Sequence, residues 1–214
     1  MIFEQIAVGG DRNFAYLVGD DETRRAAVVD PAFDPELVLE RASAHGLEIA
    51  YLLNTHAHYD HAGGNEVVLA RTSAEWVMRP RAKGEPPAPR SLSLGRVTLE
   101  LLPTPGHTPD SVCILAKEPA SPGKLITGDT LFVGKVGGTD YEAGARAEYD
   151  SLHRVLLALP DDTEVWPGHD VGVRPRSTLG DERRTNPFLL RKSFEEFVEL
   201  KRGWLAYKRA HGIA

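Results

Sequence analysis

THAHYDHAGG, residues 55–64, is the stretch that decides the fold, because it places three histidines and one aspartate within six consecutive positions. It directly follows the apolar run of residues 49–54, which is typical of a strand buried on both faces. A helix is predicted after it, over residues 65–71. Imidazole nitrogen and carboxylate oxygen are the ligands that zinc, iron(II) or manganese accepts in proteins. The stretch therefore predicts a metal-binding loop at the end of a buried strand.

Three later segments also place a histidine or an aspartate just past an apolar, strand-like run. They are PGH at 105–107, GD at 128–129 and PGH at 167–169. Ligands of α/β proteins bind at the carboxyl ends of strands, so we expect these segments to meet the first loop. The candidate metal ligands are His56, His58, Asp60, His61, His107, Asp129 and His169. We expect His45, His153 and His211 to be ordinary polar residues.

The spacing within the first loop allows two metal ions to be held side by side. His56 and His58 can converge on one ion, while Asp60 and His61 can face a neighbouring one. The two PGH histidines complete the ligand sets, and Asp129 can bridge because a carboxylate has two oxygens. A PGH segment alone is only a turn, but its recurrence with the other segments favours a metal site over a purely structural role.

Composition excludes several other classes of protein. The net charge of −6 over 214 residues argues against nucleic acid or an anionic membrane as the main partner. No apolar run approaches the ~20 residues of a membrane span, and the N-terminus lacks a signal-peptide pattern. A single cysteine, Cys113, excludes an intrachain disulfide and lies in an apolar run, where we expect a core residue. We therefore expect a cytoplasmic enzyme.

Periodicity predicts two successive β-rich halves, each followed by helices. We expect strands at 14–18, 25–30, 49–54, 74–78, 97–104, 111–116, 124–132 and 163–167, and helices at 35–45, 65–71, 148–158 and 193–208. The proline-rich segment 79–91 is predicted to be a loop. This layout indicates an α/β fold, a four-layer αββα sandwich in one domain over residues 1–214, with a C-terminal helical segment at about 188–214. That segment either packs on the domain or forms a homodimer contact.

The motifs THAHYDHAGG, TPGHT, GDTLF and PGHD together resemble the successive motifs of the metallo-β-lactamase superfamily, in the same order and at similar spacing. The resemblance covers nearly the whole chain and implies the αββα fold. It also implies a ligand assignment: His56, His58 and His107 for the first metal, Asp60, His61 and His169 for the second, and Asp129 between them.

The resemblance and the donor set together predict two divalent cations, with zinc the first candidate and iron or manganese the others. Two such ions make hydroxide available near neutral pH for attack on an ester-like carbonyl. Asp60 and Asp129 are the predicted catalytic carboxylates, Asp60 by orienting the hydroxide. The chain contains no GxSxG motif of a serine hydrolase.

Two further stretches bear on the reaction. GDTLFVGKVGGTDY and STLGDERRTNPFL resemble the glyoxalase II group, which hydrolyses glutathione thioesters. They also resemble the persulfide dioxygenases, in which one iron is held at the positions of His56, His107 and Asp129. NPFL is more similar to the short bacterial glyoxalase II-like hydrolases. HYDHAGGN resembles lactonases, although Phe132 stands where those enzymes have tyrosine.

The substrate contacts are less marked in the sequence. The basic residue that helps to hold glutathione in these families would align near Gly138, where this chain has GGTDY. Lys135, Arg146 or Arg174 could replace it, and Tyr141 follows the same turn. We predict a thioester hydrolase acting on a small thiol conjugate, with a persulfide dioxygenase, a lactonase or another ester hydrolase as alternatives. A non-catalytic binding module is the alternative from a different class.

Overall fold

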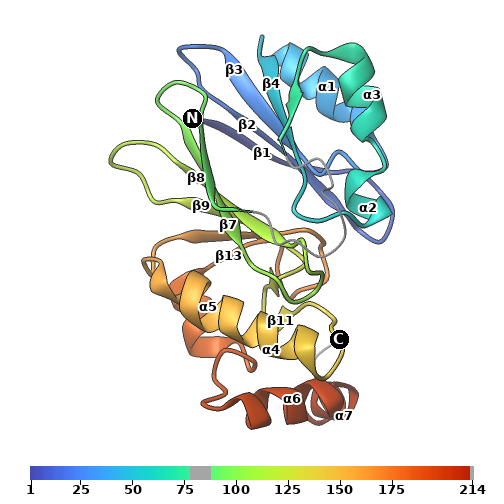
Figure 1. Cartoon of the computed structure of the whole chain (residues 1–214), viewed down its shortest axis with the longest axis vertical. Coiled ribbons are helices and arrows are strands. Elements are labelled where there is room, and N and C mark those ends of the chain that lie inside the picture. Colours follow the sequence, from blue (N-terminus) through green and yellow to red (C-terminus); the bar gives the residue numbers. More distant parts are fainter. Residues whose placement is uncertain (78–87, 213–214) are drawn as a thin grey trace.

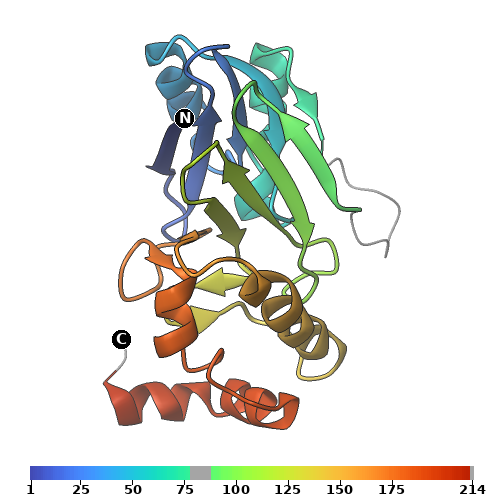
Figure 2. The same ribbon diagram turned by 90° about the vertical axis from the view of Figure 1, so that its left-hand side faces the viewer.

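The computed structural model describes residues 1–77 and 88–212. Two β-sheets face each other, with helices on the outer face of each (Figures 1 and 2). The predicted α/β class and four-layer αββα arrangement are confirmed. Within the described residues, no helix combines the length and the apolar character needed to cross a membrane.

The first sheet is built from the N-terminal half of the chain. Its strands follow one another in sequence order: β1 (Ile2–Ala7), β2 (Phe14–Gly19), β3 (Arg25–Val29), β4 (Glu48–Leu53) and β5 (Glu75–Trp76). The helices of this half are α1 (Pro35–Ala44), α2 (Tyr59–Ala62) and α3 (Asn65–Arg71). As predicted, α1 begins with a proline after Asp34, whose side chain accepts a hydrogen bond from the Leu37 amide at 3.0 Å.

The second sheet is built from the C-terminal half, in the order β13-β12-β9-β8-β7-β6. Its strands are β6 (Arg90–Ser93), β7 (Thr98–Pro103), β8 (Val112–Lys117), β9 (Lys124–Gly128), β12 (Glu164–Pro167) and β13 (Ser177–Thr178). A hairpin of β10 (Leu131–Phe132) and β11 (Lys135–Val136) follows β9. The helices are α4 (Ala143–Asp150), the π-helical turn η1 (Ser151–Val155), the 3-10 turn η2 (Leu156–Ala158), α5 (Leu179–Thr185), α6 (Phe194–Arg202) and α7 (Trp204–His211).

One apolar cluster fills the space between the sheets and a second lies under the C-terminal helices. Tyr16 and Leu53 from the first sheet share the inner cluster with Leu99 and Ile114 from the second. Cys113 points to the opposite face of β8, into the cluster that η1, α5 and α6 cover. It is fully buried, which confirms its predicted place in the core.

Several predicted element boundaries are wrong. The expected helix at 148–158 instead begins at Ala143 and changes to π and then 3-10 geometry after Asp150. The expected helix at 193–208 is two helices, because Gly203 adopts a non-helical backbone conformation between α6 and α7.

The segment between the two halves differs from expectation as well. The strand predicted at 74–78 pairs only over β5, and its last residue lies outside the described residues. Part of the loop predicted at 79–91 is also outside them, but its end, Arg90 and Ser91, forms the start of β6. The edge strand β1 was not predicted, because most of its residues are only partly buried and show no clear alternation.

Strand direction explains why the motif loops gather at one edge. β3 and β4 are parallel, and β9 and β12 are parallel. β7 and β9 each pair antiparallel with β8 and therefore share a direction. The carboxyl ends of these strands meet where the sheets are joined by hydrogen bonds from Phe14 N to Gly168 O and from Val112 N to Thr55 O, both 2.8 Å long.

Candidate metal centre

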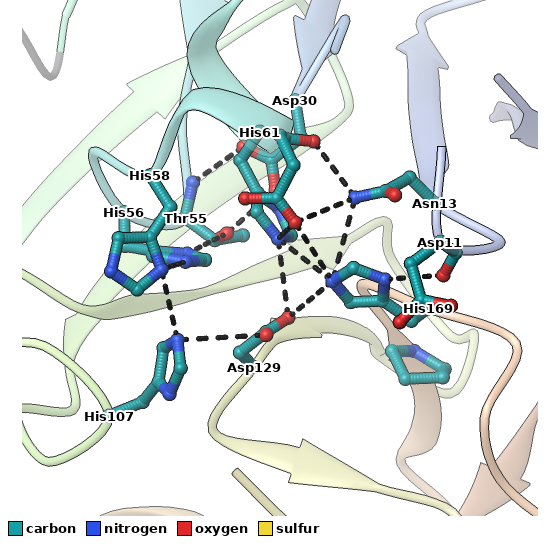
Figure 3. A network of polar contacts seen from close by, with 12 residues as sticks. Asp11, Asn13, Asp30, Thr55, His56, His58, His61, His107, Asp129 and His169 are labelled. Carbon is teal, nitrogen blue, oxygen red and sulfur yellow. Dashed lines mark hydrogen bonds and ion pairs between the residues drawn. The ribbon is translucent and has the colours of Figure 1, made fainter. Parts of the chain in front are cut away.

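All seven predicted ligands converge at this edge, as Figure 3 shows for those that it labels. The donor atoms form three sets, and the atoms of each set lie within 4.8 Å of one another. The sets are His56, His58 and His107; His56, His61 and Asp129; and Asp60, His61 and His169. The first loop after β4 and its short helix α2 carry the N-terminal ligands, while the loops after β7, β9 and β12 carry the others. The structure thus brings the seven candidate ligands together, and their assignment to particular metal ions stays a prediction.

The first group, which consists of His56, His58 and His107, contains imidazole rings alone. His58 Nδ1 lies 3.0 Å from His56 Nε2 and 3.1 Å from His107 Nε2. His56 is buried, whereas His58 is exposed and His107 is partly exposed. One side of this group is therefore accessible to a small molecule.

The second group, which consists of Asp60, His61 and His169, includes a carboxylate. His61 Nε2 lies 3.2 Å from His169 Nε2, and Asp60 Oδ2 lies 3.5 Å from the same His169 nitrogen. Both histidines are buried, while the side chain of Asp60 is 37% exposed. Asp60 is therefore the member of this group that faces solvent.

Asp129 lies between the two groups. Its Oδ1 is 3.3 Å from Nε2 of both His61 and His169, while its Oδ2 is 3.6 Å from His107 Nε2. Oδ1 is buried and forms no hydrogen bond within the described part of the chain. A buried, unsatisfied carboxylate oxygen calls for a partner, and a cation is one that its position allows.

The ring nitrogens that face away from the centre have acceptors of their own. His61 Nδ1 donates to Asp30 Oδ2 at 2.9 Å, and His169 Nδ1 donates to Asp11 O at 2.9 Å. His107 Nδ1 donates to Gly138 O at 2.7 Å. In a neutral ring these partners hold the proton on Nδ1, so that the lone pair of Nε2 is directed inward. In the neutral rings of His61 and His169, two lone pairs then face each other, an arrangement that a cation stabilises. The donor set therefore fits divalent metal ions.

Asp30 is a site residue that the sequence analysis missed. Buried at the end of β3, it accepts hydrogen bonds from Thr55 N (2.8 Å), Thr55 Oγ1 (2.6 Å) and the His61 ring. It follows an apolar strand just as the predicted ligands do, so the same rule would have found it. Asn13, which donates to Asp60 O at 2.8 Å, follows no such run and carried no signal.

The electrostatics of the two groups differ. Burial and repulsion from His61 lower the pKa of His56 to about 2, and burial also lowers the pKa of His107. Burial opposes charge on His61, but Asp30 and Asp129 raise its pKa to about 10. Burial opposes charge on Asp129 too, yet contacts with His169 and His61 hold its pKa well below the ordinary value. His56 and His107 therefore favour the neutral form of the ring, and the second group attracts positive charge.

The predicted substrate contacts lie outside the three donor sets. Lys135 Nζ is 5.0 Å above the Phe132 ring, and burial, with Lys208 and Arg12 nearby, lowers the pKa of Lys135. Tyr141 is half exposed, with the Arg202 guanidinium 5.6 Å from its ring.

The other basic candidates are engaged elsewhere. Arg146 stacks on Phe194, and Arg174 forms an ion pair with Asp181 at 2.9 Å. An added Cβ at Gly138 would meet nothing within 4 Å, so the space above this position is open. Outside the centre, His45 contacts Glu4, and His153 and His211 pack on tyrosine rings.

Comparison with known proteins agrees with this geometry. The family model described as the metallo-beta-lactamase superfamily matches residues 8–93 and 90–169. A probable hydroxyacylglutathione hydrolase of Schizosaccharomyces pombe is 35% identical over 217 positions, with 85% of this chain and 84% of the relative covered. The human mitochondrial persulfide dioxygenase is 34% identical over 203 positions, with 87% and 75% covered.

Solved structures agree too. The crystal structure of ETHE1 from Myxococcus xanthus superposes with a TM-score of 0.80 at 33% identity, with 95% of this chain and 91% of that chain covered. The resemblance to the glyoxalase II and persulfide dioxygenase group is thereby confirmed. With its αββα fold, its metal-binding type of donor cluster and these relatives, the chain belongs to the metallo-beta-lactamase superfamily.

Proposed function

We propose that this chain is a metal-dependent hydrolase that cleaves a thioester of glutathione or of a related thiol. The observation that carries the proposal is the position of Asp129, whose two oxygens face two different ligand groups. A carboxylate placed in this way suits a pair of metal ions rather than a single one. His56, His58 and His107 would hold one ion, Asp60, His61 and His169 the other, with zinc the first candidate and iron or manganese the alternatives.

The bound ions would supply an activated water as nucleophile and polarise the carbonyl of the substrate. The chain supplies the surroundings. Asp60 is partly exposed, and Asn13 Nδ2, 3.2 Å from its Oδ2, fixes the carboxylate. This carboxylate can accept a proton from an approaching water and hold it in place. His58 and His107 form the accessible side, from which a small thioester can approach.

A persulfide dioxygenase is the second candidate, because the human relative with that name is nearly as similar to this chain as the hydrolase relative. In that alternative one iron would use His56, His107 and Asp129. His107 Nε2 and Asp129 Oδ2 are 3.6 Å apart, which suits a shared ion. The second ligand group would then have no metal role.

Elemental analysis together with two activity assays tests the proposal. We expect close to two metal ions per chain, hydrolysis of S-lactoylglutathione, and loss of that activity in EDTA with recovery on adding zinc, iron or manganese. The variant His211→Asn is the matched control, because this exposed histidine lies on α7 outside the centre. A single iron with oxygen uptake on glutathione persulfide would instead establish the dioxygenase. Metal binding with neither activity would favour another ester substrate or a binding module.

A further inference from the structure

A buried ion pair outside the metal centre joins α6, the next-to-last helix of the described chain, to α4. Lys201 Nζ lies 2.5 Å from Glu148 Oε2, and the side chains are 6% and 0% exposed. The second oxygen, Glu148 Oε1, has no hydrogen-bond partner among the described residues. Burial raises the pKa of Glu148 to about 7 even though Lys201 opposes this change. Because desolvation offsets the attraction in such pairs, stability alone is a poor reason for this one.

The lysine also holds a loop of the second half. Its ammonium donates to Gly137 O at 2.7 Å and to Thr139 Oγ1 at 3.0 Å. Between these two residues lies Gly138, whose carbonyl accepts the Nδ1 hydrogen of His107. Lys201 therefore contacts both neighbours of the acceptor that orients this histidine, one through its backbone carbonyl and the other through its side-chain hydroxyl.

The loop is in tight contact with the centre. A Cβ added at Gly137 would lie 1.9 Å from Asp129 O and 3.3 Å from His107 Cβ. A small shift of this backbone would therefore reach both residues. Because the Gly138 carbonyl sets the orientation of the His107 ring, the same shift would also turn Nε2 of His107 away from the other ligands.

The glutamate lies on the other side of the same histidine. A Cβ added at Gly106 would lie 2.4 Å from Glu148 Cβ, so α4 directly supports the turn that carries His107. Three residues further on, Ser151 Oγ donates to Pro105 O at 2.8 Å. The ion pair thus connects the segment that bears the ligand to the loop that orients it.

We propose that Lys201, paired with Glu148, is a positioning residue that orients His107 for metal binding from outside the metal centre. This inference rests on the proposed metal centre but not on which substrate the enzyme cleaves. It assigns α6 a role in the centre, although none of the seven candidate ligands lies on that helix.

Metal affinity, measured by competition with a chelator, tests this role. Lys201→Met removes the ammonium but keeps an unbranched chain, and we expect the affinity for one ion to fall about 10- to 100-fold while the other stays unchanged. Glu148→Gln, which keeps the volume of the side chain, is the second variant and is expected to give a smaller fall for the same ion. The control is Lys192→Met, an exposed lysine that precedes α6.

A double-mutant cycle separates positioning from general stability. If Lys201 acts through His107, adding Lys201→Met to His107→Ala causes no further loss of metal affinity. In His169→Ala, where the first group remains, Lys201→Met still causes the full loss. Equal losses in both backgrounds, or a lower thermal unfolding temperature with unchanged affinity, would overturn the proposal. Metal binding without any hydrolysis would leave it standing and contradict only the proposed function.

Discussion

The N-terminal half of the chain contributes four of the seven candidate ligands from the single segment after β4, whereas the C-terminal half contributes three from the ends of β7, β9 and β12. The supports differ as well. In the first half the side chains of Asp30 and Asn13 hold His61 and Asp60. In the second half backbone carbonyls hold the rings of His107 and His169, although one of these carbonyls comes from the loop before β2.

This difference shows which half depends on the fold as a whole. The loop after β4 keeps its histidines within six residues of one another, so its ligands remain neighbours whatever the rest of the chain does. The other ligands meet only because β8 returns the chain between β7 and β9 and because β12 lies beside β9. We therefore expect changes in the second half to disturb the centre more widely.

The largest expected effect comes from Asp129→Ala, because this residue faces both ligand groups. We expect nearly complete loss of both ions and a fall in kcat/KM on the order of 10⁴-fold. Elemental analysis and thioester hydrolysis measure the two losses. The control variant is Asp162→Ala, because Asp162 is exposed. If one ion and a substantial rate remained in Asp129→Ala, the bridging position assigned to this carboxylate would be wrong.

The same contrast explains how much the sequence could predict. All seven candidate ligands were identified because strand-end histidines and aspartates leave a visible pattern. The carbonyls of Asp11 and Gly138 could not be found, because every residue has a carbonyl and only tertiary structure selects which one accepts. The sandwich followed from two β-rich halves, yet the break at Gly203 and the π turn after Asp150 depend on packing that periodicity does not contain.

A paired comparison of His58→Ala with His169→Ala comes next in size. For a two-ion hydrolase, each variant loses about one ion, and kcat/KM falls on the order of 10³-fold in both. His169 is buried and His58 is exposed, so we also expect His169→Ala to unfold at a lower temperature than His58→Ala. Full metal content and undiminished turnover in His169→Ala would show that the second group is not used, as a one-iron enzyme requires.

A smaller effect is expected from Asp30→Asn, which tests the side-chain supports of the first half. Asparagine tolerates the positive φ of 51° at this position, so the backbone conformation is preserved. It removes the charge that holds the His61 ring, and we expect the affinity for one ion to fall about 10- to 100-fold. Chelator competition measures this, with Asp34→Asn, an exposed helix cap, as the matched control. If Asp30→Asn instead lost the ion held by the first group, the role given to Asp30 as a support of the second group would be wrong.

The smallest effect is expected where helices are held by apolar packing rather than by metal. Cys113 lies in the apolar cluster that η1, α5 and α6 cover, so we expect these helices to stay packed on the second sheet when EDTA removes the ions and stops turnover. Cys113 is a probe for this, because the thiolate is the reactive form and burial raises the pKa of this thiol to about 11. At about pH 8 we expect no labelling of Cys113 with or without EDTA, and full labelling in denaturant. Rapid labelling in EDTA alone would mean that the metal ions, rather than the apolar cluster, hold the C-terminal half in place.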